Sequence, residues 1–176
     1  MFMRHAEKPE NGDRGVSPSG KDDPESLTPR GWQRAGALAR FFCPQREDRL
    51  TPTVIFAAGV GHGSPSRRSI ETVTPLVELL SEGDGPPVPF VTSHLKDDDQ
   101  DLIDDVLTRD GAILVCWEHK RIPALIALLP DAPTVPSVWP DDRFDMVWEL
   151  DRTASGWTFS QRPQLVLAGD SAEPIG

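Results

Sequence analysis

Cysteine is scarce in this sequence, and long apolar runs are absent from it. Cys43 and Cys116 are the two cysteines among 176 residues, and we interpret both as reduced packing thiols of a reducing compartment. No apolar run reaches the roughly 20 residues of a membrane span, and no signal peptide precedes Arg4. We therefore expect a cytoplasmic protein with no membrane partner.

Positive charge is also in short supply. Lys and Arg number 18 against 28 Asp and Glu, for a formal net charge of −10. This balance argues against nucleic acid and anionic membrane surfaces as partners. An anionic substrate stays open, because the sign of a pocket is set locally. The chain also lacks a glycine-rich phosphate loop with lysine and a dinucleotide fingerprint, so a nucleotide-binding domain is disfavoured.

Acidic residues cluster in "KDDDQDLIDDV" (96–106). We interpret this stretch as a solvated helix with aspartates near its N-terminus. Its spacing does not fit a calcium loop, whose glycine is missing. We expect no metal site here and no cofactor elsewhere.

The remaining pattern is an alternation of strands and helices over one domain, residues 1–176. Apolar runs predict strands at 1–3, 53–58, 87–93 and 112–117, with an antiparallel edge from 146–152 and 157–168. Helical spacing predicts helices over 28–42, 66–80, 99–109 and 120–129, the second kinked or restarted at Pro75. Residues 9–27 read as a long loop. We expect an α/β fold, a three-layer α/β/α sandwich with a mainly parallel central sheet.

Basic side chains follow three of the predicted strands. Arg4 and His5 end the first strand, a Gly/Ser-rich turn leading to Arg67 and Arg68 follows the second, and His119 comes after "AILVCW". Parallel sheets bind ligands beyond the carboxyl ends of their strands. We therefore expect these groups to meet at one edge.

Two histidines and two arginines at one edge suit a phosphoryl group. The planar guanidinium fork matches phosphate oxygens, and neutral imidazole is a nucleophile near neutral pH. A phosphohistidine divides hydrolysis into two displacements. Nothing in this set of residues requires a metal.

Motifs in the same order occur in a known family. "MRHAEKP", "LTPRGWQRAGALARFF", "SRRSIET", "ILVCWEHKRIPALIALL" and "WPDDRFDMVWEL" resemble the successive motifs of the histidine phosphatase superfamily, which has the phosphoglycerate-mutase-like fold. The resemblance spans nearly the whole chain. Two departures stand out: Ala6 replaces a glycine, and residues 81–95 show no equivalent of the glutamate that many members use as general acid.

The resemblance implies roles for individual residues. His5 is the implied nucleophile, Arg4 and Arg68 the phosphate clamps, and His119 the second histidine. Arg67 is the alternative to Arg68 as the second clamp. The motif has its arginine four residues before the threonine, here Thr72, and this spacing favours Arg68.

For further residues the resemblance leaves alternatives open. Ser66, or Ser64, could add a hydroxyl to the phosphate site, and His62 is either a substrate contact or a solvated loop residue. The general acid stays open between Glu118 and Glu7.

We expect a metal-independent phosphatase that hydrolyses a phosphorylated small molecule or a phosphoprotein through phospho-His5. The alternatives are a non-catalytic module of the same fold that binds phosphorylated ligands, and, less favoured, a phosphomutase.

Overall fold

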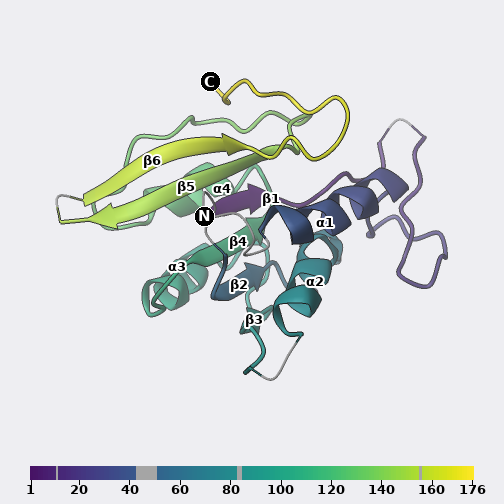
Figure 1. Ribbon diagram of the computed structural model, residues 1–176, viewed down its shortest axis with the longest axis horizontal. Helices are drawn as coiled ribbons and strands as arrows, with labels where there is room; N and C mark the ends of the chain where they lie inside the picture. The colour runs from purple at the N-terminus through teal and green to yellow at the C-terminus, as the bar shows by residue number, and fades with distance from the viewer. Residues whose placement is uncertain (11, 43–50, 83–84, 155) are drawn as a thin grey trace.

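The computed structural model describes residues 1–10, 12–42, 51–82, 85–154 and 156–176; Cys43 lies outside these ranges. Within them, six strands form one sheet in the order β3-β2-β4-β1-β5-β6 (Figure 1). The strands are β1 (Phe2–Arg4), β2 (Val54–Ala57), β3 (Phe90–Val91), β4 (Ile113–Trp117), β5 (Met146–Thr153) and β6 (Gly156–Pro163). The first four are mutually parallel, whereas β5 and β6 form the antiparallel edge.

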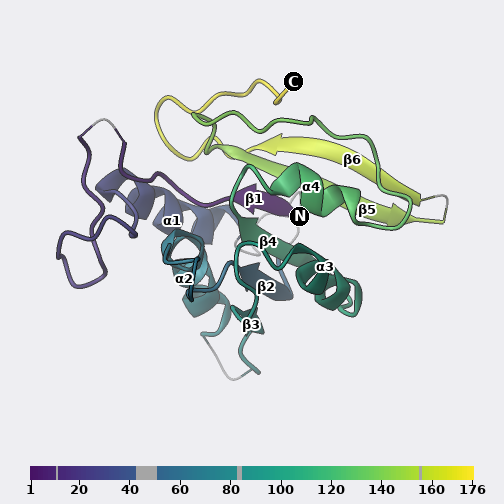
Figure 2. The same cartoon turned by 180° about the vertical axis from the view of Figure 1, so that it is seen from behind.

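Helices cover both faces of this sheet. Helices α1 (Pro29–Phe41) and α2 (Arg68–Leu80) pack against each other on one face, and α3 (Asp99–Leu107) and α4 (Ile122–Ala127) cover the other (Figures 1 and 2). Between each pair of helices and the sheet lies an apolar core. The predicted three-layer sandwich is confirmed.

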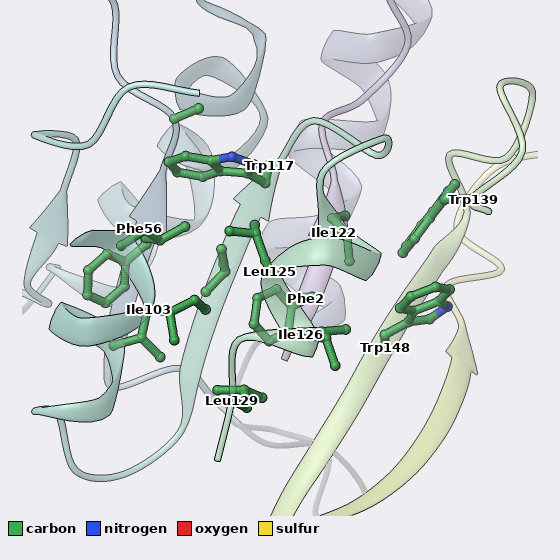
Figure 3. Close-up of a cluster of buried hydrophobic side chains, with 14 of the residues drawn as sticks. Phe2, Phe56, Ile103, Trp117, Ile122, Leu125, Ile126, Leu129, Trp139 and Trp148 are labelled. Carbon is green, nitrogen blue, oxygen red and sulfur yellow. The ribbon is translucent and has the colours of Figure 1, made fainter. Parts of the chain in front are cut away.

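Alternation along the strands divides the apolar side chains between the two cores. Phe2, Val115 and Trp117 contribute to the core beneath α3 and α4 (Figure 3), whereas Met3 and Cys116 contribute to the core beneath α1 and α2. Successive residues of a strand point to opposite faces. The short central strands are therefore buried on both faces, as continuous apolar runs indicate.

Helix α1 begins where the sequence predicts. The Thr28 hydroxyl accepts a hydrogen bond from the Gly31 N–H at 3.1 Å, and Pro29 occupies the first turn. Helix α3 places its aspartates at the surface and buries Leu102 and Ile103, as expected for a solvated amphipathic helix.

Two local predictions need correction. Of the kink and the restart expected at Pro75, the restart is wrong: helix α2 continues through Pro75 to Leu80, since a proline removes a single backbone donor and α1 packs along the same helix. Strand β6 ends at Pro163 rather than continuing to Ala168. Leu165 adopts a positive φ of 51°, and the Asp170 carboxylate accepts hydrogen bonds from the backbone N–H groups of Val166 and Leu167. This stretch therefore turns instead of pairing with β5.

No helix among the described residues has the length and apolar character needed to cross a membrane.

Candidate active site

The register of the parallel strands brings three loops to one edge of the sheet. Arg4 lies opposite Trp117 in the β1–β4 pair, and Ala57 lies opposite Cys116 in the β2–β4 pair. The residues that follow these strands are therefore neighbours in space. This edge of the sheet is where the loops that carry His5, Arg68 and His119 leave their strands.

A cavity of about 200 Å³ lies between these loops. It is lined by His5, Lys8, Ala58, Ser64, Pro65, Ser66, Arg68, Ser69, Lys96, Glu118 and His119. In a chain of net charge −10, its lining holds three permanently basic side chains and one carboxylate. The cavity thus has the local charge that an anionic ligand requires.

His5 presents one free nitrogen. Its Nδ1 lies 2.7 Å from the carbonyl oxygen of Ala6, and because a carbonyl can only accept, Nδ1 carries the proton. The lone pair is therefore at Nε2. Burial, helped by the charges of Arg4 and Arg68, lowers the pKa of His5 to about 3 against the opposing effect of the Ala6 carbonyl. His5 is therefore neutral at physiological pH, and its Nε2 lone pair is not protonated.

Arg4, an implied phosphate clamp, is not among the residues that line the cavity. Its Nη1 donates to the carbonyl oxygens of Pro140, Asp141 and Arg143 at 3.3, 2.5 and 3.2 Å, and its guanidinium stacks 3.6 Å from the centroid of the Phe144 ring. Burial lowers the pKa of Arg4 to about 10, so the side chain stays charged. Arg4 thereby fixes the loop before β5 beside the two histidines.

Arg68 stands at the first position of α2 and faces the cavity. Its Nη2 donates to the Pro24 carbonyl at 2.6 Å and to the Glu25 carboxylate at 3.3 Å. These contacts hold one side of the guanidinium against the 9–27 loop. The loop therefore helps to orient the arginine.

His119 pairs with a residue that the sequence analysis did not single out. Its Nε2 lies 2.6 Å from Oδ1 of Asp141, in the loop that Arg4 anchors. Asp141 belongs to "WPDDRFDMVWEL", but 22 residues separate it from His119 and no spacing rule connects them. The only sequence signal was an acidic pair in a segment that returns to the sheet.

Buried polar atoms without partners gather at this site. Among the described residues, the buried side-chain nitrogens and oxygens that have no hydrogen-bond partner are Nε and Nη2 of Arg4, Nε of Arg68 and Nδ1 of His119. Unsatisfied buried polar groups are rare and destabilising. All of these atoms belong to the three residues that, with His5, the resemblance assigns to phosphate chemistry. An oxyanion is the ligand that the N–H groups of the two arginines would satisfy.

The structure brings some of the other candidates to the cavity. Glu118 and Ser66 line it. Ser64 also lines it, but its hydroxyl donates to the Gly59 carbonyl at 2.9 Å and so supports the turn.

Three candidates lie elsewhere. The Glu7 carboxylate is paired with Arg34 at 2.9 Å, away from the cavity lining. Arg67 has a side chain that is 57% exposed and lies 3.8 Å from Asp23, and His62 is exposed on its turn. Of the two adjacent arginines, Arg68 therefore lies at the cavity and Arg67 does not, as the spacing to Thr72 predicts.

No group of three or more histidine, cysteine, aspartate or glutamate side chains in the described ranges is arranged to hold a metal ion.

Comparisons with known proteins fit this geometry. Neither a family model nor a curated protein matches the sequence. The structure is similar to that of the protein histidine phosphatase SixA complexed with tungstate, over 93% of this chain and 95% of SixA, with a TM-score of 0.51 and 15% sequence identity. The chain therefore has the fold of the histidine phosphatase superfamily, the fold that its motifs predicted.

Proposed function

We propose that this protein is a phosphatase that hydrolyses phosphomonoesters, including phosphoproteins, through a phosphohistidine on His5. The observation that carries the proposal is the set of partnerless buried nitrogens of Arg4, Arg68 and His119, together with a cavity that is lined by His5, Arg68 and His119. These groups can neutralise the equatorial oxygens of a phosphoryl group, which is the main demand of phosphoryl transfer.

In the first displacement, Nε2 of His5 attacks phosphorus and the bond from phosphorus to the leaving oxygen breaks. His5 starts neutral, because its pKa is about 3, and its Nδ1–H bond to the Ala6 carbonyl keeps the lone pair on Nε2. The departing alkoxide takes a proton. Glu118 is our candidate donor, since it is the carboxylic acid in the cavity lining.

In the second displacement, water attacks the phosphorus of phospho-His5. The phosphorus–nitrogen bond breaks, inorganic phosphate forms, and the carboxylate left by the first step takes a proton from the water. The charge compensation comes from arginine and histidine throughout. The mechanism therefore requires no metal, and activity should withstand chelation.

The substrate class rests on two supports. The basic lining of the cavity favours a phosphorylated ligand, and the structurally similar SixA is a protein histidine phosphatase. We therefore include phosphoproteins beside small phosphomonoesters.

The test is hydrolysis of p-nitrophenyl phosphate by the wild type and His5→Ala, with His62→Ala as the matched histidine control. His62 is exposed and outside the cavity lining. We expect loss of turnover in His5→Ala, activity close to wild type in His62→Ala, and an acid-labile phosphate on wild-type enzyme quenched during turnover. Wild-type turnover in His5→Ala would refute the proposal. Tungstate binding without turnover of any substrate would instead identify the phospholigand-binding module.

A further inference from the structure

One nitrogen of the His119 imidazole has a hydrogen-bond partner and the other has none. Its Nε2 lies 2.6 Å from Oδ1 of Asp141, while its Nδ1 is buried without a partner. Because a carboxylate only accepts, Nε2 carries the proton of the neutral ring and Nδ1 carries the lone pair. A lone pair cannot donate a hydrogen bond to an oxyanion.

His119 lines the cavity and Asp141 does not. Because the bond to Asp141 occupies Nε2, Nδ1 is the ring nitrogen that remains for a ligand in the cavity. To hold a phosphoryl oxygen, Nδ1 must first gain a proton. His119 would then be an imidazolium between two anions, the Asp141 carboxylate and the bound phosphoryl group.

The charges around His119 keep it neutral while the cavity is empty. Burial lowers its pKa first, Arg4 and Lys8 lower it further, and Asp141 opposes them. The remaining ionisable neighbours are His5, Arg68, Lys96 and Glu118 in the cavity lining and Lys120, whose Nζ is 3.8 Å from Asp141. A dianionic ligand adds negative charge to this largely positive surrounding. Ligand binding therefore reverses the balance and favours the charged ring.

Asp141 is held in position although its side chain is 69% exposed. Its own carbonyl oxygen accepts a hydrogen bond from Nη1 of Arg4 at 2.5 Å, and the same guanidinium nitrogen bonds the Pro140 and Arg143 carbonyls. One arginine thus fixes the loop that fixes the histidine. This arrangement distinguishes Asp141 from a surface aspartate in chance contact.

We propose that His119 takes up a proton at Nδ1 when the cavity binds a phosphoryl group, and that Asp141 is the positioning residue that makes this uptake possible. The proposal deepens the proposed function and rests on it, because it assumes that the cavity is the phosphoryl site. The charged ring then donates from Nδ1 to the ligand while Nε2 donates to Asp141. The proton comes from solvent or from a monoanionic ligand.

The experiment is calorimetric titration with tungstate, which is fully ionised at neutral pH, in buffers of different ionisation enthalpy. The dependence of the heat on the buffer counts the protons taken up per ligand bound. We expect uptake close to one proton in the wild type. Asp141→Asn keeps an oxygen acceptor for Nε2–H and loses the charge, so uptake should fall by at least half and tungstate affinity about tenfold. Asp141→Glu should restore both.

Asp142→Asn is the matched control, because it removes the same charge from the neighbouring exposed aspartate, which does not line the cavity. It should take up protons and bind tungstate like the wild type. Nitrogen-15 spectra of the His119 ring should show Nδ1 becoming protonated on tungstate addition, a readout on the wild type that needs no folded variant.

The outcomes separate the two proposals. Tungstate binding by the wild type without proton uptake, or with Nδ1 of His119 unprotonated, would overturn the role of His119 and leave the phosphatase proposal intact. Equal uptake in the wild type and Asp141→Asn would overturn the role of Asp141. Absence of tungstate binding by the wild type would reject the phosphoryl site and this inference with it.

Discussion

The Thr72 hydroxyl accepts a hydrogen bond from the backbone N–H of Ala6 at 2.8 Å and donates one to the Arg68 carbonyl at 2.6 Å. One side chain therefore ties the residue after His5 to the first turn of α2. The four-residue interval explains the motif, because residues i and i+4 of a helix lie one above the other. Thr72 couples the position of His5 to that of Arg68.

Replacing Thr72 by valine keeps the shape of the side chain and removes this link. The Ala6 N–H is left buried without a partner, so we expect the free energy of unfolding to fall by about 1–3 kcal/mol and turnover to fall with it. Urea unfolding and steady-state kinetics measure the two effects. Thr74→Val is the control, because the Thr74 hydroxyl donates within α2, to the Ile70 carbonyl. Matching effects in the two variants would contradict the coupling.

Glu118 can be tested as proton donor through the leaving group. An alkyl phosphate needs a proton on its departing oxygen, whereas p-nitrophenolate departs with little help. We expect Glu118→Gln to lower alkyl-phosphate turnover by roughly 10²–10⁴-fold and to affect p-nitrophenyl phosphate far less. Equal effects on the two substrates would clear Glu118 of this role and assign it to support of the neighbouring loop.

Glu7, the other carboxylate considered as donor, should behave differently. Its oxygens accept from Nε and Nη2 of Arg34, at 3.1 and 2.9 Å, and the same guanidinium bonds Asp170 at 2.7 Å. Arg34 and Asp170 are almost fully buried. Breaking a buried ion pair destabilises a protein by about 3–5 kcal/mol. We expect Glu7→Gln to lower the free energy of unfolding measurably and to slow alkyl and aryl phosphates alike; a selective loss with alkyl phosphates would restore Glu7 as a donor.

The low pKa of His5 predicts a pH dependence of stability. The folded-state pKa is about 3 and the unfolded-state pKa about 6.5, so between these values the unfolded state binds a proton that the folded state does not. Stability from this residue is present above pH ~6.5 and is lost as the pH falls, by up to about 1.4 kcal/mol per unit. We expect the wild type to lose more stability than His5→Gln between about pH 7 and pH 5 in denaturant titrations. Parallel losses would show that His5 is not shielded from protonation in the folded state.

Much of the fold could be predicted from the sequence because its signals are local. The apolar run 112–117 predicts a strand and Thr28 predicts a helix start, each from a few neighbouring residues. The structure has β4 and α1 at these positions. The continuation of α2 through Pro75 and the turn at Leu165 could not be predicted this way. They depend on packing against α1 and on the carboxylate of Asp170, which only tertiary structure brings into place.

The same division holds for the candidate site. Strand order and the motifs pointed to His5, Arg68 and His119, and the structure places all three around one cavity. Closeness in sequence to His5 made Glu7 a candidate general acid, but its carboxylate pairs with the buried guanidinium of Arg34 instead. Asp141 could not be predicted from the sequence, because its contact with His119 depends on the return of the chain to the sheet at β5.

The central place of β1 in the sheet has a consequence for biosynthesis. This strand is made before both of its sheet partners, β4, which follows more than a hundred residues later, and β5, which comes later still. A chain emerging from the ribosome must hold Phe2 and Met3, both buried in the finished fold, without their partners until those strands have been translated. Such long-range pairing slows folding and leaves apolar segments open to aggregation or chaperones in the meantime. His5, at the end of β1, is thus synthesised well before the strands that complete its surroundings.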